Sequence, residues 1–110
     1  MPFCKAVNEA GEIIVYMAAS DTHFSALKAY ESIHLNVKRD IENRRLNGAA
    51  FCFHSRVRFS DSAEKVPAVE VELHFRGQPA SVWYFPYKMD DGKATVLEYY
   101  TNDAKENLFA

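Results

Sequence analysis

His34 is the side chain best suited to acid–base chemistry, and it lies within an apolar stripe of an expected helix. A histidine can exchange a proton near neutral pH, and a tyrosine hydroxyl beside it can donate a hydrogen bond to a ligand. No carboxylate falls on the same expected face, so the alternative is a core histidine bonded to a tyrosine. The candidate ligand-binding set around the helix consists of Tyr30, His34, Ser55, Trp83, Tyr87 and Tyr99.

A second group of residues could bind a metal ion. Cys52, His54 and His74 are expected on the solvent-facing side of two neighbouring strands, and Cys4 could complete the set. Structural zinc sites normally carry their ligands as closely spaced pairs on turns, and this sequence has no such pair. We therefore expect a solvated strand face, with no metal and no cofactor. The two cysteines are expected as free thiols in a reducing cytoplasm.

Composition limits the classes of function. The chain has 110 residues, 48% of them hydrophobic, with a net charge of −2, which predicts one globular domain over residues 1–110. A nucleic-acid-binding protein normally has a clear excess of basic residues, so no nucleic-acid partner is expected. No apolar run approaches the roughly 18 residues of a membrane span, and no apolar leader follows Lys5. We expect a cytoplasmic protein with no membrane partner.

One helix and several strands are expected to position these side chains. A helix is predicted from Thr22 to Leu46, because this stretch lacks proline and glycine and precedes Asn47-Gly48, a favourable C-cap. Residues 3–7 and 12–17 flank a glycine turn and predict one or two N-terminal strands. The helix should lie on a sheet, because its apolar residues recur along one stripe: Leu27, Tyr30, His34, Val37 and Ile41.

Four further strands are expected between Gly48 and Thr101, because apolar residues alternate with polar ones there. We expect the odd-numbered side chains from Phe51 to Tyr99 to face the helix and the even-numbered ones to face solvent. The first turn is centred near Glu64 and the third hairpin near Asp91. The expected cross-strand pairs are Arg58–Glu70, Arg56–Glu72, His54–His74, Phe85–Leu97 and Trp83–Tyr99.

The even-numbered side chains of the last two expected strands should face solvent, but they are less polar than a solvated face normally is. Exposed apolar and aromatic patches usually mark a surface for a partner, and tyrosine is frequent at such interfaces. The alternative is that the N-terminal segment covers this band. The candidate interface consists of Val82, Tyr84, Pro86, Val96 and Tyr100.

The segment from Val82 to Thr101 has an aromatic strand, an Asp91-Gly92-Lys93 turn and a strand ending in Tyr99-Tyr100, and Asp103–Phe109 could form a short helix. It resembles the closing hairpin of the NTF2-like (SnoaL-type, cystatin-like superfamily) proteins. The resemblance implies a cone-shaped roll, a cavity under the sheet and frequent dimerisation through the outer sheet face. The family includes isomerases, hydrolases, cyclases and non-catalytic members. This chain departs from it by starting with a strand or hairpin and by lacking expected buried acidic residues, so no catalytic role is carried over.

The sequence therefore predicts an α+β fold, with one long helix on a curved antiparallel sheet of four to six strands. Two functions remain open. The first is a small non-enzymatic interaction module that forms a homodimer or binds another protein through the outer sheet face. The alternative is an NTF2-like cavity protein that binds or transforms a small apolar molecule with His34 as its polar group. A pocket of roughly 300 Å³ or more, lined by His34, Tyr30 and Trp83, would favour the alternative.

Overall fold

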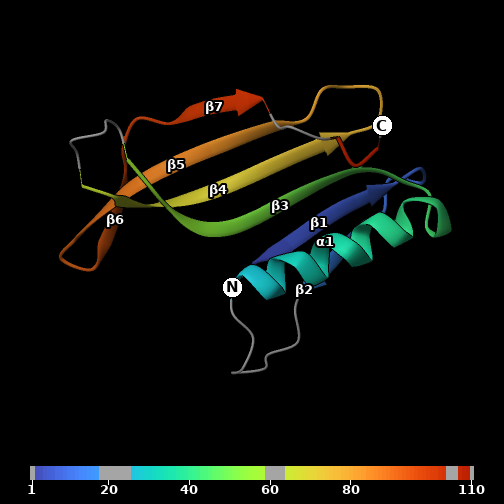
Figure 1. Cartoon of the computed structure of the whole chain (residues 1–110), viewed down its shortest axis with the longest axis horizontal. Helices are drawn as coiled ribbons and strands as arrows, with labels where there is room; N and C mark the ends of the chain where they lie inside the picture. The colour runs from blue at the N-terminus through green and yellow to red at the C-terminus, as the bar shows by residue number, and fades with distance from the viewer. Residues whose placement is uncertain (1, 18–25, 59–63, 104–106, 110) are drawn as a thin grey trace.

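The computed structural model describes residues 2–17, 26–58, 64–103 and 107–109. In these residues one helix lies against one face of a curled antiparallel sheet (Figure 1), which confirms the expected α+β fold. This arrangement is compatible with an NTF2-like roll. The elements are β1 (Phe3–Asn8), β2 (Ile13–Met17), α1 (Ala26–Asn43), β3 (Leu46–Val57), β4 (Val66–Phe75), β5 (Ser81–Asp90), β6 (Lys93–Val96) and β7 (Tyr100–Asp103).

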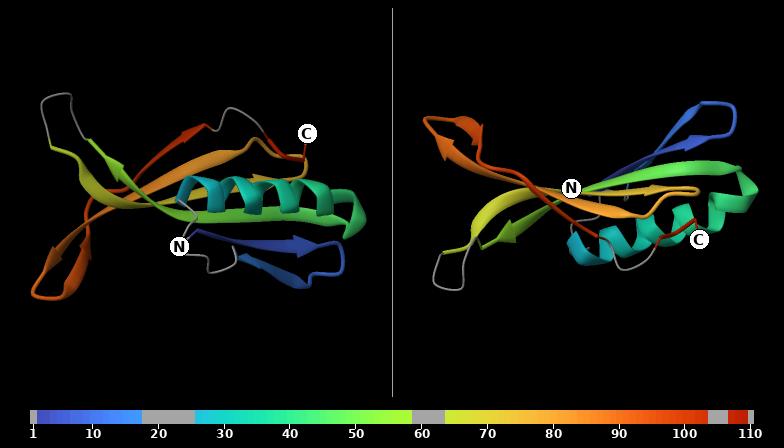
Figure 2. Two further views of the ribbon diagram at one scale, coloured as in Figure 1. Left: turned by 60° about the horizontal axis from the view of Figure 1, so that its bottom comes forward. Right: turned by 90° about the horizontal axis from the view of Figure 1, so that it is seen from above.

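The strands follow the order β2-β1-β3-β4-β5-β6, and β7 also pairs with β5. β7 lies beside the start of β5 and β6 beside its end, so the two short strands share one edge of β5 in succession. Figure 2 shows α1 running along β3 and the β1–β2 hairpin, while the β5–β6 hairpin extends past the helix. One part of the sheet is therefore covered by the helix on one face, and the opposite face has no helix over it in the described residues. We call these faces the helix side and the outer face.

The core forms where the apolar stripe of α1 meets the helix side of β1 and β3. Cross-strand pairing puts Cys4 beside Phe51 and Ala6 beside Ala49, and the small side chains allow the helix to approach closely. Burial of this apolar surface is the main stabilising contribution to the fold. The buried cluster consists of Cys4, Ala6, Ile33, Val37, Leu46, Ala49, Phe51 and Phe109.

The C-terminal end of the helix differs from the prediction, because α1 ends at Asn43 and not at Leu46. The expected start at Thr22 and the N-cap residues 20–22 lie outside the described part of the chain. The residue in the left-handed conformation after the helix is Arg45, with φ 52°, and not Gly48. Gly48 instead lies inside β3, where a Cβ atom would come within 2.5 Å of the Phe75 ring. The absence of a side chain at Gly48 leaves room for the Phe75 ring against the backbone of β3.

The predicted register between β3 and β4 is wrong. Glu70 lies opposite Phe53, Glu72 opposite Phe51 and His74 opposite Ala49. The first turn is therefore centred before Glu64, and the displacement from the expected register is an odd number of residues. An odd displacement moves each side chain of a strand to the other face of the sheet. The polar residues of β4 consequently lie on the helix side, and its apolar residues point to the outer face.

The same correction carries over to β5 and its partners. Val82 lies opposite Glu72 and Tyr84 opposite Glu70, so both are on the helix side, whereas Trp83 is on the outer face opposite Val71. The Asp91-Gly92 turn occurs where predicted, with φ of 49° and 75°. The expected pairing of Phe85 with Leu97 is wrong by one residue, because Tyr87 pairs with Val96.

The end of the chain also differs from its prediction. Trp83 pairs with Thr101 instead of Tyr99. An irregular stretch between β6 and β7 causes this offset, and in it the Leu97 N–H donates to the Pro86 carbonyl oxygen at 2.8 Å. The segment expected to start a short helix at Asp103 begins instead as the end of β7, and residues 107–109 form a turn.

Candidate functional site

The structure divides the predicted ligand-binding set between the two faces of the sheet. Tyr30 and His34 project from α1, and Ser55 lies on the helix side of β3 opposite Ala68. The other three predicted residues lie on the outer face, because the register of β4 and β5 differs from the expected one. They are Trp83, Tyr87 and Tyr99.

Glu72 is the centre of a hydrogen-bond network on the helix side. The Tyr30 hydroxyl donates to Glu72 Oε1 at 2.7 Å, and His74 Nε2 lies 3.2 Å from Glu72 Oε2. His74 Nδ1 accepts the backbone N–H of Leu108 at 3.3 Å, so its proton is on Nε2, which donates to Glu72. Glu72 therefore accepts two hydrogen bonds and joins α1 and β4, and His74 extends this link to the C-terminal segment.

Glu70 and Glu72 have opposite pKa shifts although both project from the helix side of β4. Burial alone would raise the pKa of Glu72, but hydrogen bonds from His74 and Tyr30 outweigh it and lower the pKa overall. Burial raises the pKa of Glu70, and the charge of Glu72 raises it further, while the Ser55 hydroxyl works against the rise. Neither carboxyl group belongs to the predicted site, because the alternation in β4 placed both on the solvent-facing side.

A cavity of about 450 Å³ lies beside these carboxyl groups, at the N-terminal end of α1. The Tyr30 and Phe53 rings form one wall, with centroids 4.8 Å apart. A largely apolar cavity of this size with a few polar groups is typical of a small-molecule site. The lining residues are Pro2, Leu27, Tyr30, Phe53, His54, Glu70 and Glu72.

His34 and Trp83 do not line this cavity. The His34 ring packs beside it, 5.6 Å from the Tyr30 ring and 5.2 Å from the Phe51 ring, measured between centroids. The Trp83 ring stacks with Tyr99 at 5.9 Å on the outer face. The cavity therefore contains one residue of the predicted ligand-binding set, Tyr30, and its polar groups from β3 and β4 were not predicted to bind a small molecule.

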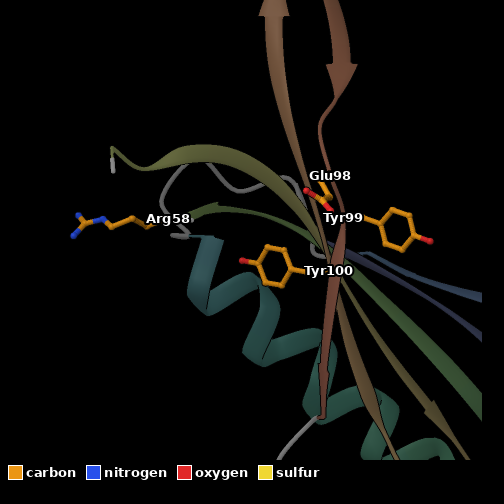
Figure 3. Close-up of a pocket in the computed structure, with 4 residues that line it drawn as sticks. All are labelled: Arg58, Glu98, Tyr99 and Tyr100. Atoms are coloured by element: carbon orange, nitrogen blue, oxygen red, sulfur yellow. The ribbon is translucent and has the colours of Figure 1, made fainter. Parts of the chain in front are cut away.

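A second hollow, of about 340 Å³, is lined by Arg58, Glu98, Tyr99 and Tyr100. Figure 3 shows the Tyr99 and Tyr100 rings pointing to opposite sides of the chain and the Arg58 guanidinium pointing away from both. The Tyr100 ring stacks on Tyr84 with centroids 4.8 Å apart. The side chains around this hollow do not converge on one point, so it lacks the arrangement of a binding site.

The predicted interface residues are also redistributed. Val82, Tyr84 and Pro86 lie on the helix side of β5, and Tyr100 lies there with them through its stacking on Tyr84. Val96 is exposed in the β5–β6 hairpin. The reason is again the register, which puts the even-numbered residues of β5 on the helix side and the odd-numbered ones on the outer face.

On β4 and β5, the outer face is formed by residues that were expected to face the helix, among them Val71 and Trp83. One continuous row of paired residues crosses six strands: Met17, Phe3, Cys52, Val71, Trp83 and Thr101. Beside it Val15 is 53%, Val69 40% and Phe75 39% exposed. The Phe85 ring extends this surface by stacking with Tyr99. A large apolar surface on a sheet face is a feature of interaction sites.

The possible metal ligands do not come together. Cys4 is buried on the helix side, and burial raises the pKa of its thiol to about 12. Cys52 and His54 lie on the outer side, and His54 Nε2 lies 2.6 Å from the Tyr87 hydroxyl oxygen. No cluster of three metal-ligating side chains occurs among the residues that the structure describes.

Comparison of the chain with protein-family models, with curated proteins and with solved structures finds no match. Among the described elements, α1 is not long and apolar enough to cross a membrane.

Proposed function

We propose that the chain is a non-enzymatic interaction module that pairs with a second copy of itself through the outer face of its sheet. One observation carries this proposal: the apolar side chains of β4 point away from the helix, to a face that no helix covers within the described residues. These residues are Val69, Val71, Leu73 and Phe75. Burying them against another sheet would remove this apolar surface from water.

The dimensions of the outer face fit a stable dimer. The six strands are spaced about 4.8 Å apart and range from about 13 Å (β7) to about 40 Å (β3), so they give a face of roughly 700 Å² before side-chain relief is counted. This is of the same order as the roughly 800 Å² that each partner contributes to a standard interface.

Charge placement favours a second copy over an unrelated partner. Lys5 and Asp103 lie in the same cross-strand row, on either side of Leu73. In a two-fold interface the same surface meets itself. A two-fold axis along β4 places Lys5 of each copy opposite Asp103 of the other.

Sedimentation equilibrium of two matched variants tests the pairing. Val69→Glu puts a charge on the outer face, whereas Leu35→Glu puts the same charge on the solvent side of α1, where Leu35 is 70% exposed. We expect the wild type and Leu35→Glu to be dimers and Val69→Glu to associate roughly a hundredfold more weakly, because the interface would bury an unpaired charge. A monomeric wild type, or a Val69→Glu variant that associates normally, would contradict the proposal.

The cavity supports a second candidate function, the binding of a small molecule. Its size of about 450 Å³ and its aromatic wall support this function. The α+β roll and the Asp91-Gly92-Lys93 hairpin support membership of the NTF2-like class, for which the sequence resemblance implies such a cavity. The free cysteines Cys4 and Cys52 support a reducing location such as the cytoplasm.

An NMR screen with small apolar compounds tests this second function. Binding in the cavity should shift the backbone amide signals of Tyr30 and Phe53 and leave those of Leu73 on the outer face unchanged. Shifts confined to the outer face, or no shifts with any compound, would contradict it.

A further inference from the structure

We propose that the ligand of the cavity is an organic cation, a protonated amine joined to an apolar body. The inference rests on the proposed small-molecule function of the cavity and adds the chemical class of the ligand. It is carried by two carboxylates, Glu70 and Glu72, at the edge of an apolar space with no lysine or arginine among the lining residues within the described ranges.

The charges around the cavity select against an anion. Glu70 and Glu72 both carry negative charge when ionised, so an anionic ligand would meet like charges in a partly desolvated site. Among the lining residues that the structure describes, His54 is the one basic residue, and its Nε2 atom lies 2.6 Å from the Tyr87 hydroxyl oxygen on the outer side.

Of the two carboxylates, Glu70 is the one that a cation would stabilise most. Glu72 already accepts hydrogen bonds from Tyr30 and His74. Glu70 has neither of these donors, and its ionised form is disfavoured by burial and by the neighbouring Glu72. An ammonium group placed beside Glu70 would offset both effects through a charge-assisted hydrogen bond.

The walls of the cavity suit the remainder of such a ligand. The Tyr30 and Phe53 rings stand 4.8 Å apart, between centroids, beside the carboxyl groups. Aromatic faces attract cations and also pack against flat apolar groups. Leu27 and Pro2 supply further apolar contact at the edge of the cavity.

Isothermal titration calorimetry with three indole compounds at neutral pH tests the ligand class. Tryptamine carries an ammonium group, indole-3-ethanol a neutral hydroxyl and indole-3-propionate a carboxylate. We expect tryptamine to bind about tenfold more tightly than indole-3-ethanol, because of its charge-assisted bond and cation–π contact. No binding is expected for indole-3-propionate.

Two charge-matched variants locate the effect. Glu70→Gln should weaken tryptamine binding about tenfold and leave indole-3-ethanol binding unchanged. Glu31→Gln removes the same charge from an exposed position of α1 and should change neither affinity. Circular dichroism establishes that each variant is folded, and the comparison of ligands on the wild type is independent of the variants.

The outcomes separate this inference from the proposed function beneath it. Equal affinities for tryptamine and indole-3-ethanol, or tighter binding of indole-3-propionate, would overturn the cationic class and leave the cavity as a binding site. No binding of any of the three, together with no hit in the NMR screen, would overturn both. A tryptamine preference that survives Glu70→Gln would overturn the assignment of the ammonium to Glu70.

Discussion

Glu70 and Glu72 are two residues apart on one strand, yet their surroundings make them chemically different. Tyr30 and His74 donate hydrogen bonds to Glu72 and stabilise its ionised form, whereas burial next to Glu72 destabilises the ionised form of Glu70. The sequence shows the alternation of these glutamates with valines. It does not show that the Tyr30 hydroxyl reaches Glu72 from the helix. The alternating glutamates are therefore predicted to face solvent.

Carboxyl-detected NMR titration tests this difference. We expect Glu72 to titrate below the ordinary pKa of 4.5 and Glu70 above it, in line with the opposite shifts. A lowered pKa means that Glu72 contributes stability above pH 4.5, which is lost as the pH falls through its folded-state value. A raised pKa means that ionisation of Glu70 reduces stability as the pH rises through its folded-state value. The reverse order of the two midpoints would contradict the network.

At the scale of elements, a buried polar contact ties β2 to α1. The Tyr16 hydroxyl donates to Asp40 Oδ2 at 2.8 Å, and the guanidinium groups of Arg39 and Arg44 lie 3.7 Å and 3.6 Å from the same carboxylate. Burial, together with the bond to Asp40, raises the pKa of Tyr16 to about 12. Asp40 is 7% exposed, so it depends on these partners.

Tyr16→Phe removes the hydroxyl donor and leaves the aromatic ring. We expect the free energy of unfolding to fall by about 1–3 kcal/mol, because a buried carboxylate loses a hydrogen bond. Urea denaturation measures the change. Tyr99→Phe, at a position that is 59% exposed, serves as the control and should change stability by no more than about 0.5 kcal/mol. Equal effects of the two substitutions would show that the Tyr16–Asp40 bond does not hold β2 to the helix.

The end of α1 offers a stabilising substitution. Arg45 has φ 52°, a conformation that favours glycine, and its ion pair with Glu9 is long and exposed at 3.9 Å. Arg45→Gly should raise the free energy of unfolding by about 0.5 kcal/mol, since relief of backbone strain exceeds the extra entropy of the unfolded chain. Arg45→Ala removes the same side chain without relieving the strain and should give no gain. A gain for alanine equal to that for glycine would exclude the backbone explanation.

Elements with strong local signals were predictable from the sequence, and their relative placement was not. The helix and the Asp91-Gly92 turn follow from spacing and glycine position. The register of β3 with β4 depends on the length of the turn between them, which contains no glycine that would locate it. An error of an odd number of residues in that turn reverses the faces of β4 and β5. Trp83, predicted to face the helix, therefore lies on the outer face, and Tyr84 lies on the helix side.

At the scale of the whole molecule, the sheet has apolar side chains on both faces and a helix on one. Alternation in β4 and β5 predicted a sheet with one buried face. The sequence alone does not state which parity the helix will cover. The structure answers this by leaving Val71 and Trp83 on the outer face, where a second copy of the chain can bury them.

Isotope-filtered NOE spectroscopy on an equal mixture of labelled and unlabelled protein tests the pairing of the outer faces most directly. With a two-fold axis along β4, the methyl groups of Val71 and Leu73 should show intermolecular NOEs to the same strand of the other copy. The absence of any intermolecular NOE from the outer face, or intermolecular NOEs confined to Leu35 and the solvent side of α1, would contradict the account.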